Sequence, residues 1–127
     1  MGMFQVKVTV SHLQRPDQRF THDFWVDSGA LYSFVPEEEL QQLGVEPTDV
    51  RNLILADGRT DKRLMGFCHF EIAGLKGALP CPVIFGPKGS LFLLGATALE
   101  LFGVDVDPSN KRLVPTLSVI GGFLASQ

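Results

Sequence analysis

The sequence predicts an all-β domain, a closed sandwich or barrel of short strands with two short helices. Apolar and polar residues alternate over residues 4–10, as expected for a strand with one buried face. An Asp-Gly pair at residues 57–58 lies between two strand-like segments, which indicates a β-hairpin. The 13 glycines and 8 prolines among the 127 residues exceed the usual share and favour many turns between short elements.

The chain length fits one domain, and composition excludes several classes of function. With 45% hydrophobic residues and a net charge of −3, residues 1–127 are expected to fold around one core. Lys and Arg number 11 against 14 Asp and Glu, which gives little support for nucleic-acid binding. The apolar runs are too short for a membrane-spanning helix, and no signal peptide is recognised. We therefore expect a cytoplasmic protein that binds neither a nucleic acid nor a membrane.

The first half of the chain is expected to form a hairpin, a short strand and a helix. Residues 3–26 contain two strands around a turn at residues 15–18. Residues 31–35 form the next strand. A helix then begins after Pro36, with three glutamates in its first turn, and ends at Gly44.

The second half is expected to form two more hairpins, a strand, a second helix and terminal strands. The first of these hairpins joins residues 52–56 to residues 60–65 through a type I′ turn at Asp-Gly. The second joins residues 67–73 to residues 78–85. Residues 91–94 form a continuous apolar strand that ends at a glycine. The remaining elements are a helix over residues 97–102 and strands over residues 112–114 and 117–120.

The two cysteines, Cys68 and Cys81, are too few for a disulfide framework. If the hairpin over residues 67–85 turns at Gly74-Leu75, the two cysteines face each other on neighbouring strands. That register would be compatible with a disulfide. Without a secretory context, we expect buried thiols instead.

Asp27 is the residue that ordinary core packing explains least. It lies between the apolar residues 24–26 and residues 30–31, where burying an unpaired carboxylate is costly. One interpretation is a surface turn in which Asp27 caps its own backbone. The other is a functional carboxylate, and the order of the following segments favours it. That order is an Asp-Ser-Gly-Ala loop, a short helix, a hairpin, and Leu-Leu-Gly-Ala before a second short helix.

This order resembles the retropepsin-like aspartic peptidases, the family of the retroviral proteases and their bacterial and eukaryotic relatives, over residues 3–120. The family's catalytic Asp-Ser/Thr-Gly-Ala loop is matched by residues 27–30, and its flap hairpin by residues 53–64. Two apolar residues and a glycine before its second helix are matched by residues 93–95. The resemblance implies a bacterial-type, single-domain member with the retropepsin fold and one catalytic half per chain. It also implies an aspartic endopeptidase that acts as a homodimer on a peptide or protein.

The same resemblance implies that Asp27 is catalytic, with Ser28 and Gly29 beside it. Two Asp27 carboxylates at a two-fold axis cannot both ionise easily, so the pair shares a proton. The ionised carboxylate activates a water, and the protonated one acts as an acid toward the substrate. The Ser28 hydroxyl could hydrogen-bond across the axis, and Gly29 lets the backbone approach without a Cβ. No cofactor and no metal is expected.

A further set of residues would bind the substrate by its position in the family's pattern, with plain core packing as the alternative interpretation. An extended, apolar peptide is the substrate expected. The chain departs from the viral pattern at Leu31 and Ala96, which stand where viral members commonly carry an acid and an arginine. The expected substrate-binding residues are Trp25, Ala30, Ile54, Ala56, Asp57, Gly58 and Leu93.

Other functions stay open at this point. The missing charge pair and the charged tip of the flap, within residues 57–63, motivate a dimerisation or peptide-binding module with little turnover. A small-ligand β-barrel with a coincidental Asp-Ser-Gly loop is a third interpretation, and it would be a monomer. Three scattered histidines form no zinc motif. The apolar terminal segments, residues 4–10 and 117–124, are expected to pair across the two-fold axis of a dimer, because exposed edge strands are a liability.

Overall fold

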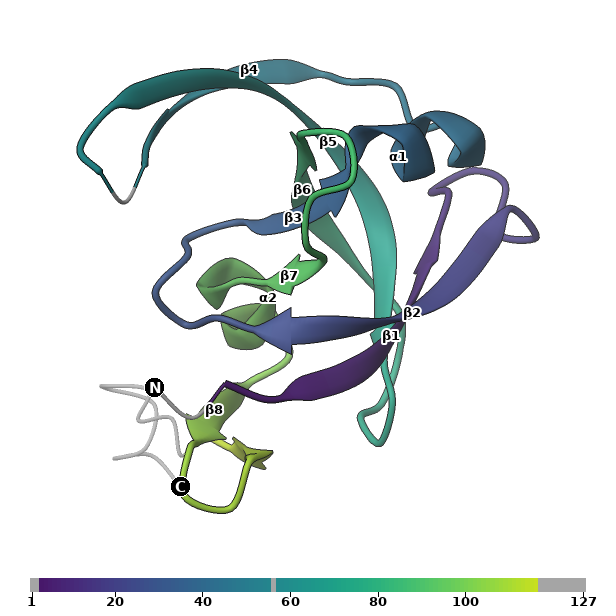
Figure 1. Cartoon of the computed structure of the whole chain (residues 1–127). Coiled ribbons are helices and arrows are strands. Elements are labelled where there is room, and N and C mark those ends of the chain that lie inside the picture. The colour runs from purple at the N-terminus through teal and green to yellow at the C-terminus, as the bar shows by residue number, and fades with distance from the viewer. Residues whose placement is uncertain (1–2, 56, 117–127) are drawn as a thin grey trace, which may run out of the picture.

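A computed structural model describes residues 3–55 and 57–116 (Figure 1). The predicted strand at residues 117–120, and the pairing of residues 117–124 across a dimer, lie outside the described residues. Within the described part, strands predominate and two short helices are present, so the all-β prediction is confirmed. In chain order the elements are β1 (Gln5–Ser11), β2 (Arg19–Val26), β3 (Ser33–Pro36), α1 (Glu37–Leu43), β4 (Asp49–Ile54), β5 (Thr60–Ile72), β6 (Leu79–Gly86), β7 (Leu93–Leu94), α2 (Ala96–Leu101), β8 (Val104–Asp107) and β9 (Arg112–Pro115).

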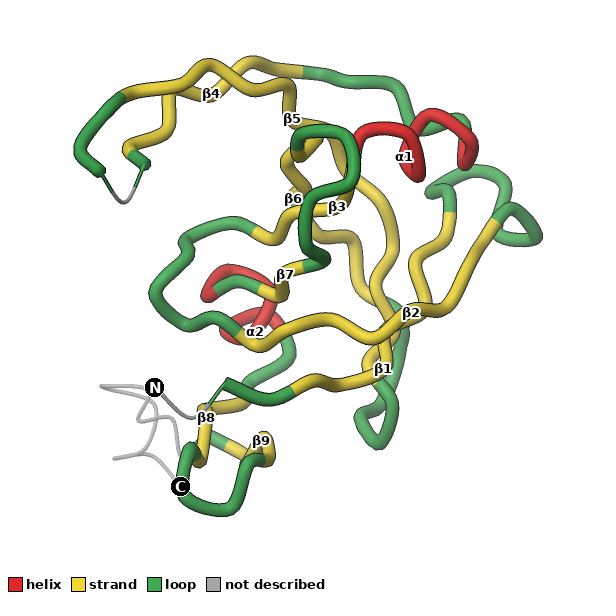
Figure 2. Tube along the Cα trace, in the orientation of Figure 1, coloured by secondary structure: helices red, strands yellow, loops and turns green. Residues whose placement is uncertain are grey.

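The main sheet is a ring of paired strands. Its order is β1-β2-β7-β3-β6-β5-β4, and an additional antiparallel pairing of β1 with β5 closes the ring. β4 lies outside the ring because it pairs with the first half of β5 alone. β8 and β9 form a separate two-stranded sheet at the end of the molecule where the described chain begins (Figure 2).

The core draws on every strand of the ring and on both helices. Phe24 of β2 and Phe70 of β5 are fully buried, and their rings meet edge to face at 5.7 Å between centroids. α1 begins after Pro36 and ends at Gly44, whose φ is 82°, as the sequence predicted. Within the described residues, neither helix has the length and apolar character needed to cross a membrane.

β5 is one long strand where the sequence predicted two. The first half of β5 pairs with β4, its middle with β6 and its end with β1. Gly66, which interrupts the strand pattern in the sequence, lies inside β5 and is buried. A Cβ on Gly66 would lie 3.1 Å from the carbonyl oxygen of Glu46 and 3.2 Å from Cγ1 of Val45. The glycine therefore marks a close approach of neighbouring chain and does not end the strand.

The hairpin of β4 and β5 is confirmed, but the prediction of a type I′ turn is wrong. A type I′ turn would place Asp57 and Gly58 at its two central positions, but Gly58, whose φ is 87°, is itself the donor of the hydrogen bond that closes the turn. The N–H of Gly58 donates to the carbonyl oxygen of Leu55 (2.9 Å), and the N–H of Leu55 donates to that of Arg59 (2.7 Å). The residues joined by the second of these bonds, Leu55 and Arg59, thus have three positions between them instead of two, and one left-handed glycine suits that connection.

The predicted register of the second hairpin is confirmed at its two cysteines. Cys68 of β5 lies directly opposite Cys81 of β6, and both are buried free thiols. Burial raises the pKa of Cys81 to about 12. Burial, with the neighbouring Cys81 as a second cause, raises the pKa of Cys68 as well. Both side chains are therefore protonated at neutral pH.

We predict that iodoacetamide does not alkylate the native protein at about pH 8, because the thiolate is the reactive form and little of it is present. The same reagent should modify both Cys68 and Cys81 once the protein is unfolded in urea. Intact-mass spectrometry counts the adducts, with glutathione as a control for the reagent. Alkylation of the folded protein at the rate of glutathione would contradict the buried, protonated pair.

Candidate functional site

The Asp27 loop, residues 27–32, joins β2 to β3 and projects to the same side of the molecule as the tip of the β4–β5 hairpin (Figure 1). The Asp27 side chain is half-buried, and its Oδ1 accepts the N–H of Gly29 at 3.0 Å. The N–H of Asp27 donates to the carbonyl oxygen of Leu94 at 2.9 Å. The carboxylate does cap its own loop, as in a surface turn, but the loop itself is attached to β7.

Two more backbone hydrogen bonds attach the Asp27 loop to the start of α2. The N–H of Ala96 donates to the carbonyl oxygen of Ala30 (2.7 Å), and the N–H of Thr97 donates to that of Leu31 (2.9 Å). Leu31 and Ala96 thus belong to segments that are bound to each other through their backbones. The structure brings together two motifs that lie far apart in the sequence.

Gly95 makes the closest approach in the site. A Cβ on Gly95 would lie 2.4 Å from the carbonyl oxygen of Tyr32 and 2.9 Å from that of Ala30, so a larger residue would displace the loop. The N–H of Gly95 donates to Oγ of Ser33 at 3.0 Å, and Ser33 is 1% exposed. Sequence reasoning missed Ser33. The signal available in the sequence is a hydroxyl inside an apolar strand. A buried hydroxyl needs a hydrogen-bond partner, so this position indicates a contact with another segment.

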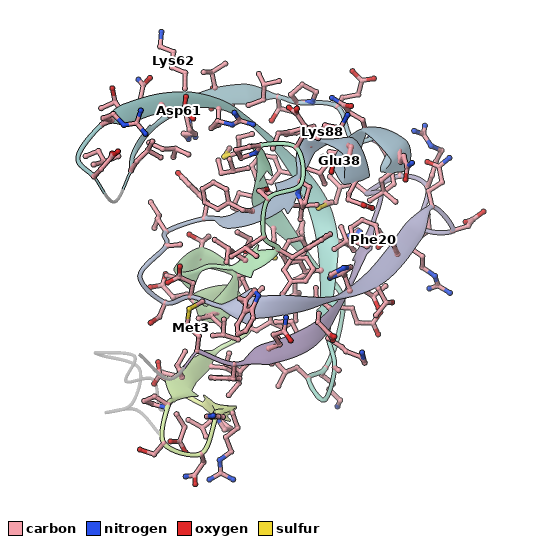
Figure 3. All side chains as sticks on the ribbon, in the orientation of Figure 1. Met3, Phe20, Glu38, Asp61, Lys62 and Lys88 are labelled. Carbon is pink, nitrogen blue, oxygen red and sulfur yellow. The ribbon has the colours of Figure 1, made fainter. Side chains whose placement is uncertain are left out.

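Ser28 and Gly29 are exposed at the tip of the Asp27 loop. A Cβ on Gly29 would lie 3.3 Å from Oδ1 of Asp27, so the small residue suits the bond between the Gly29 N–H and the carboxylate. Both residues line an open recess of about 460 Å³ together with Asp27. Met3, labelled in Figure 3, is also part of the lining. The rest of the lining is Phe4, Val26, Val106 and Pro108.

The β4–β5 hairpin extends the predicted flap, residues 53–64, to residues 49–65, and the whole segment is called the flap from here on. Two of its arginines contact the body of the molecule. Nε of Arg51 donates to the hydroxyl of Tyr32 at 3.3 Å, which connects the flap to the Asp27 loop. Nε of Arg63 donates to the carbonyl oxygen of Phe85 at 2.9 Å. Lys62, on the opposite face of the flap, points away from the body (Figure 3). Sequence reasoning did not anticipate either arginine contact.

The tip of the flap carries an apolar side chain next to a local ion pair. Ile54 is 81% exposed. The carboxylate of Asp57 accepts the backbone N–H of Arg59 at 3.0 Å and its Nε at 2.6 Å. These two hydrogen bonds, of which the backbone one has the larger effect, hold the pKa of Asp57 below its ordinary value. Asp57 is therefore engaged within the tip itself.

The structure collects the expected site residues into two groups. Asp27, Ser28, Gly29 and Ala30 share one loop, and Trp25 of β2 pairs with Leu93 of β7 directly before it. Both of these side chains are half-buried, which suits a subsite wall and core packing alike. Ile54, Asp57 and Gly58 form the second group at the flap tip, and Ala56 lies outside the described residues.

Two comparisons of the chain with known proteins found no match. No family model matches the chain, and no curated protein matches it either. In the described ranges 3–55 and 57–116, no group of three His, Cys, Asp or Glu side chains is placed to hold a metal ion.

Replacing Ser33 by alanine is expected to lower the free energy of unfolding by about 1–3 kcal/mol, because the buried N–H of Gly95 loses its acceptor. Equilibrium unfolding in urea, followed by the fluorescence of Trp25, measures the change. Ser109→Ala, at an exposed position in the β8–β9 turn, is the matched control and should change stability by less than about 0.5 kcal/mol. Equal, small effects of both substitutions would show that the Ser33 hydroxyl does not hold the site together.

Proposed function

We propose that this chain is a retropepsin-like aspartic endopeptidase that hydrolyses peptide bonds as a homodimer, through the Asp27 carboxylates of two chains. The observation that carries the proposal is the setting of the Asp27 loop. A half-buried carboxylate lies at the edge of an open recess, in a loop that three backbone hydrogen bonds attach to β7 and α2. A flap hairpin projects to the same side as this loop (Figure 1).

The recess supports a second copy of the chain as the missing part of the site. Asp27, Ser28 and Gly29 form one wall, and the remaining lining residues are apolar. Met3 on that lining is 40% exposed. A second copy of the chain, related by a two-fold axis beside the recess, would cover this apolar surface and bring its Asp27 next to the first. Two carboxylates so close together share one proton. The ionised carboxylate then acts as the base and the protonated one as the acid.

The proposed reaction needs no group beyond the two carboxylates and a water. The ionised carboxylate accepts a proton from the water, whose oxygen attacks the carbonyl carbon of the substrate. The protonated carboxylate donates its proton to the carbonyl oxygen. When the tetrahedral intermediate collapses, a proton passes to the amide nitrogen, the C–N bond breaks, and an acid and an amine leave. The N–H of Gly29 helps to hold the Asp27 carboxylate in orientation, because it donates to Oδ1.

Asp27→Asn is expected to abolish cleavage of a mixed peptide library, measured as new termini by mass spectrometry, because the pair loses its base. Sedimentation should still show a dimer. Asp23→Asn is the matched control, since Asp23 precedes Asp27 on β2 and forms an ion pair with the exposed Lys7 of β1. Full activity in Asp27→Asn would sink the assignment. Peptide binding without cleavage by the wild type would favour the binding module, and a monomer would favour the ligand barrel.

The cleavage rate is expected to be highest at acidic to neutral pH and to fall at alkaline pH, because one carboxylate of the pair must stay protonated. Initial rates on one cleaved peptide across the pH range measure this, with circular dichroism to confirm that the protein stays folded. A rate that still rises above about pH 9 would contradict a shared proton.

A further inference from the structure

One side-chain hydrogen bond joins the flap to the Asp27 loop, and the proposed reaction does not use it. Nε of Arg51 donates to the hydroxyl of Tyr32 at 3.3 Å, between residues 19 positions apart in the chain. Arg51 is in β4, which pairs with β5 outside the ring. Tyr32 is the last residue of the Asp27 loop. The bond therefore spans two segments whose backbones pair with different neighbours.

Arg51 faces a like charge across the flap and therefore needs acidic or polar partners. Arg51 lies directly opposite Arg63 in the register of β4 and β5, and like charges at opposite positions destabilise a strand pair. Asp49 forms an ion pair with Arg51, and Glu37 lies 3.7 Å from Arg63. Arg63 also donates to the carbonyl oxygen of Phe85 at 2.9 Å. Of these two opposing arginines, Arg63 holds the flap to β6 and α1, and Arg51 holds it to the Asp27 loop.

The backbone of Tyr32 is held by close packing. The carbonyl oxygen of Tyr32 packs so closely on Gly95 that a Cβ there would lie 2.4 Å away. The next residue, Ser33, accepts the N–H of Gly95 at 3.0 Å. The hydrogen bond that Arg51 donates to Tyr32, with Asp49 as a weaker cause, raises the pKa of Arg51 above its ordinary value. Tyr32 thus presents its hydroxyl, from a backbone held by close packing, to a permanently charged donor.

We propose that Arg51 is a positioning residue of the peptidase: through Tyr32 it holds the flap in register with the Asp27 loop. This inference rests on the proposed function. Loss of the bond lets the flap move away from the loop more often, so the enzyme binds its peptide less tightly. The groups around Asp27 keep their own hydrogen bonds to Gly29 and Leu94, so the chemical step is unaffected. The result is a rise in KM with kcat preserved.

Two conservative substitutions and their combination test this link. Tyr32→Phe removes the acceptor oxygen and keeps the ring, and Arg51→Lys keeps the charge and removes the Nε donor. Each should raise KM about three- to tenfold, the value of one hydrogen bond, with kcat changed less than about twofold. The KM of the double variant should be no higher than that of either single variant, because each substitution alone already removes the whole hydrogen bond. Lys7→Gln, which removes an exposed ion pair on β1, is the control and should leave both constants unchanged.

Amide hydrogen exchange measured by mass spectrometry gives a second readout that needs no activity. In Tyr32→Phe, exchange should become faster in both residues 28–33 and residues 49–54, and should not change in β1. Additive effects on KM, or faster exchange in residues 28–33 alone, would overturn the inference. A wild type without peptidase activity would overturn the proposed function, and coupled exchange of the two segments would then still uphold the link between Arg51 and Tyr32.

Discussion

The close contact between Gly95 and the Asp27 loop is the constraint on which the rest of the site depends. The carbonyl oxygens of Ala30 and Tyr32 occupy the space that a side chain on Gly95 would need. This contact lets the N–H of Gly95 reach the buried hydroxyl of Ser33, and it brings the start of α2 within hydrogen-bond distance of the loop. Because interiors are densely packed and deform little, this contact positions the backbone of the loop that carries Asp27.

The same junction explains how the loop is held without an ion pair. Here the N–H of Ala96 donates to Ala30 and the N–H of Thr97 donates to Leu31, so backbone bonds already join the two segments. Leu31 is 62% exposed and leaves an apolar surface beside the loop. Such a surface accords with the apolar peptide substrate expected from the sequence.

Local sequence signals predicted much of the fold because the interactions behind them are local. Pro36 and Gly44 bound α1 through backbone conformations that these residues favour, whatever packs on the helix. The register that places Cys68 opposite Cys81 follows from the position of one turn. The turn of the flap was mispredicted because three-residue and two-residue connections both accept Asp-Gly, and the pairing of the whole hairpin selects between them.

By itself, the sequence determined the strand-rich class, both helices, the two hairpins around β5 and the Asp-Ser-Gly-Ala loop, because periodicity and turn chemistry act over a few residues. Only the tertiary structure decided that β5 runs unbroken through Gly66, that Ser33 accepts the N–H of Gly95, and that Arg51 reaches Tyr32. Each of these depends on chain segments that meet from distant positions in the sequence, and no local pattern records which segments will meet.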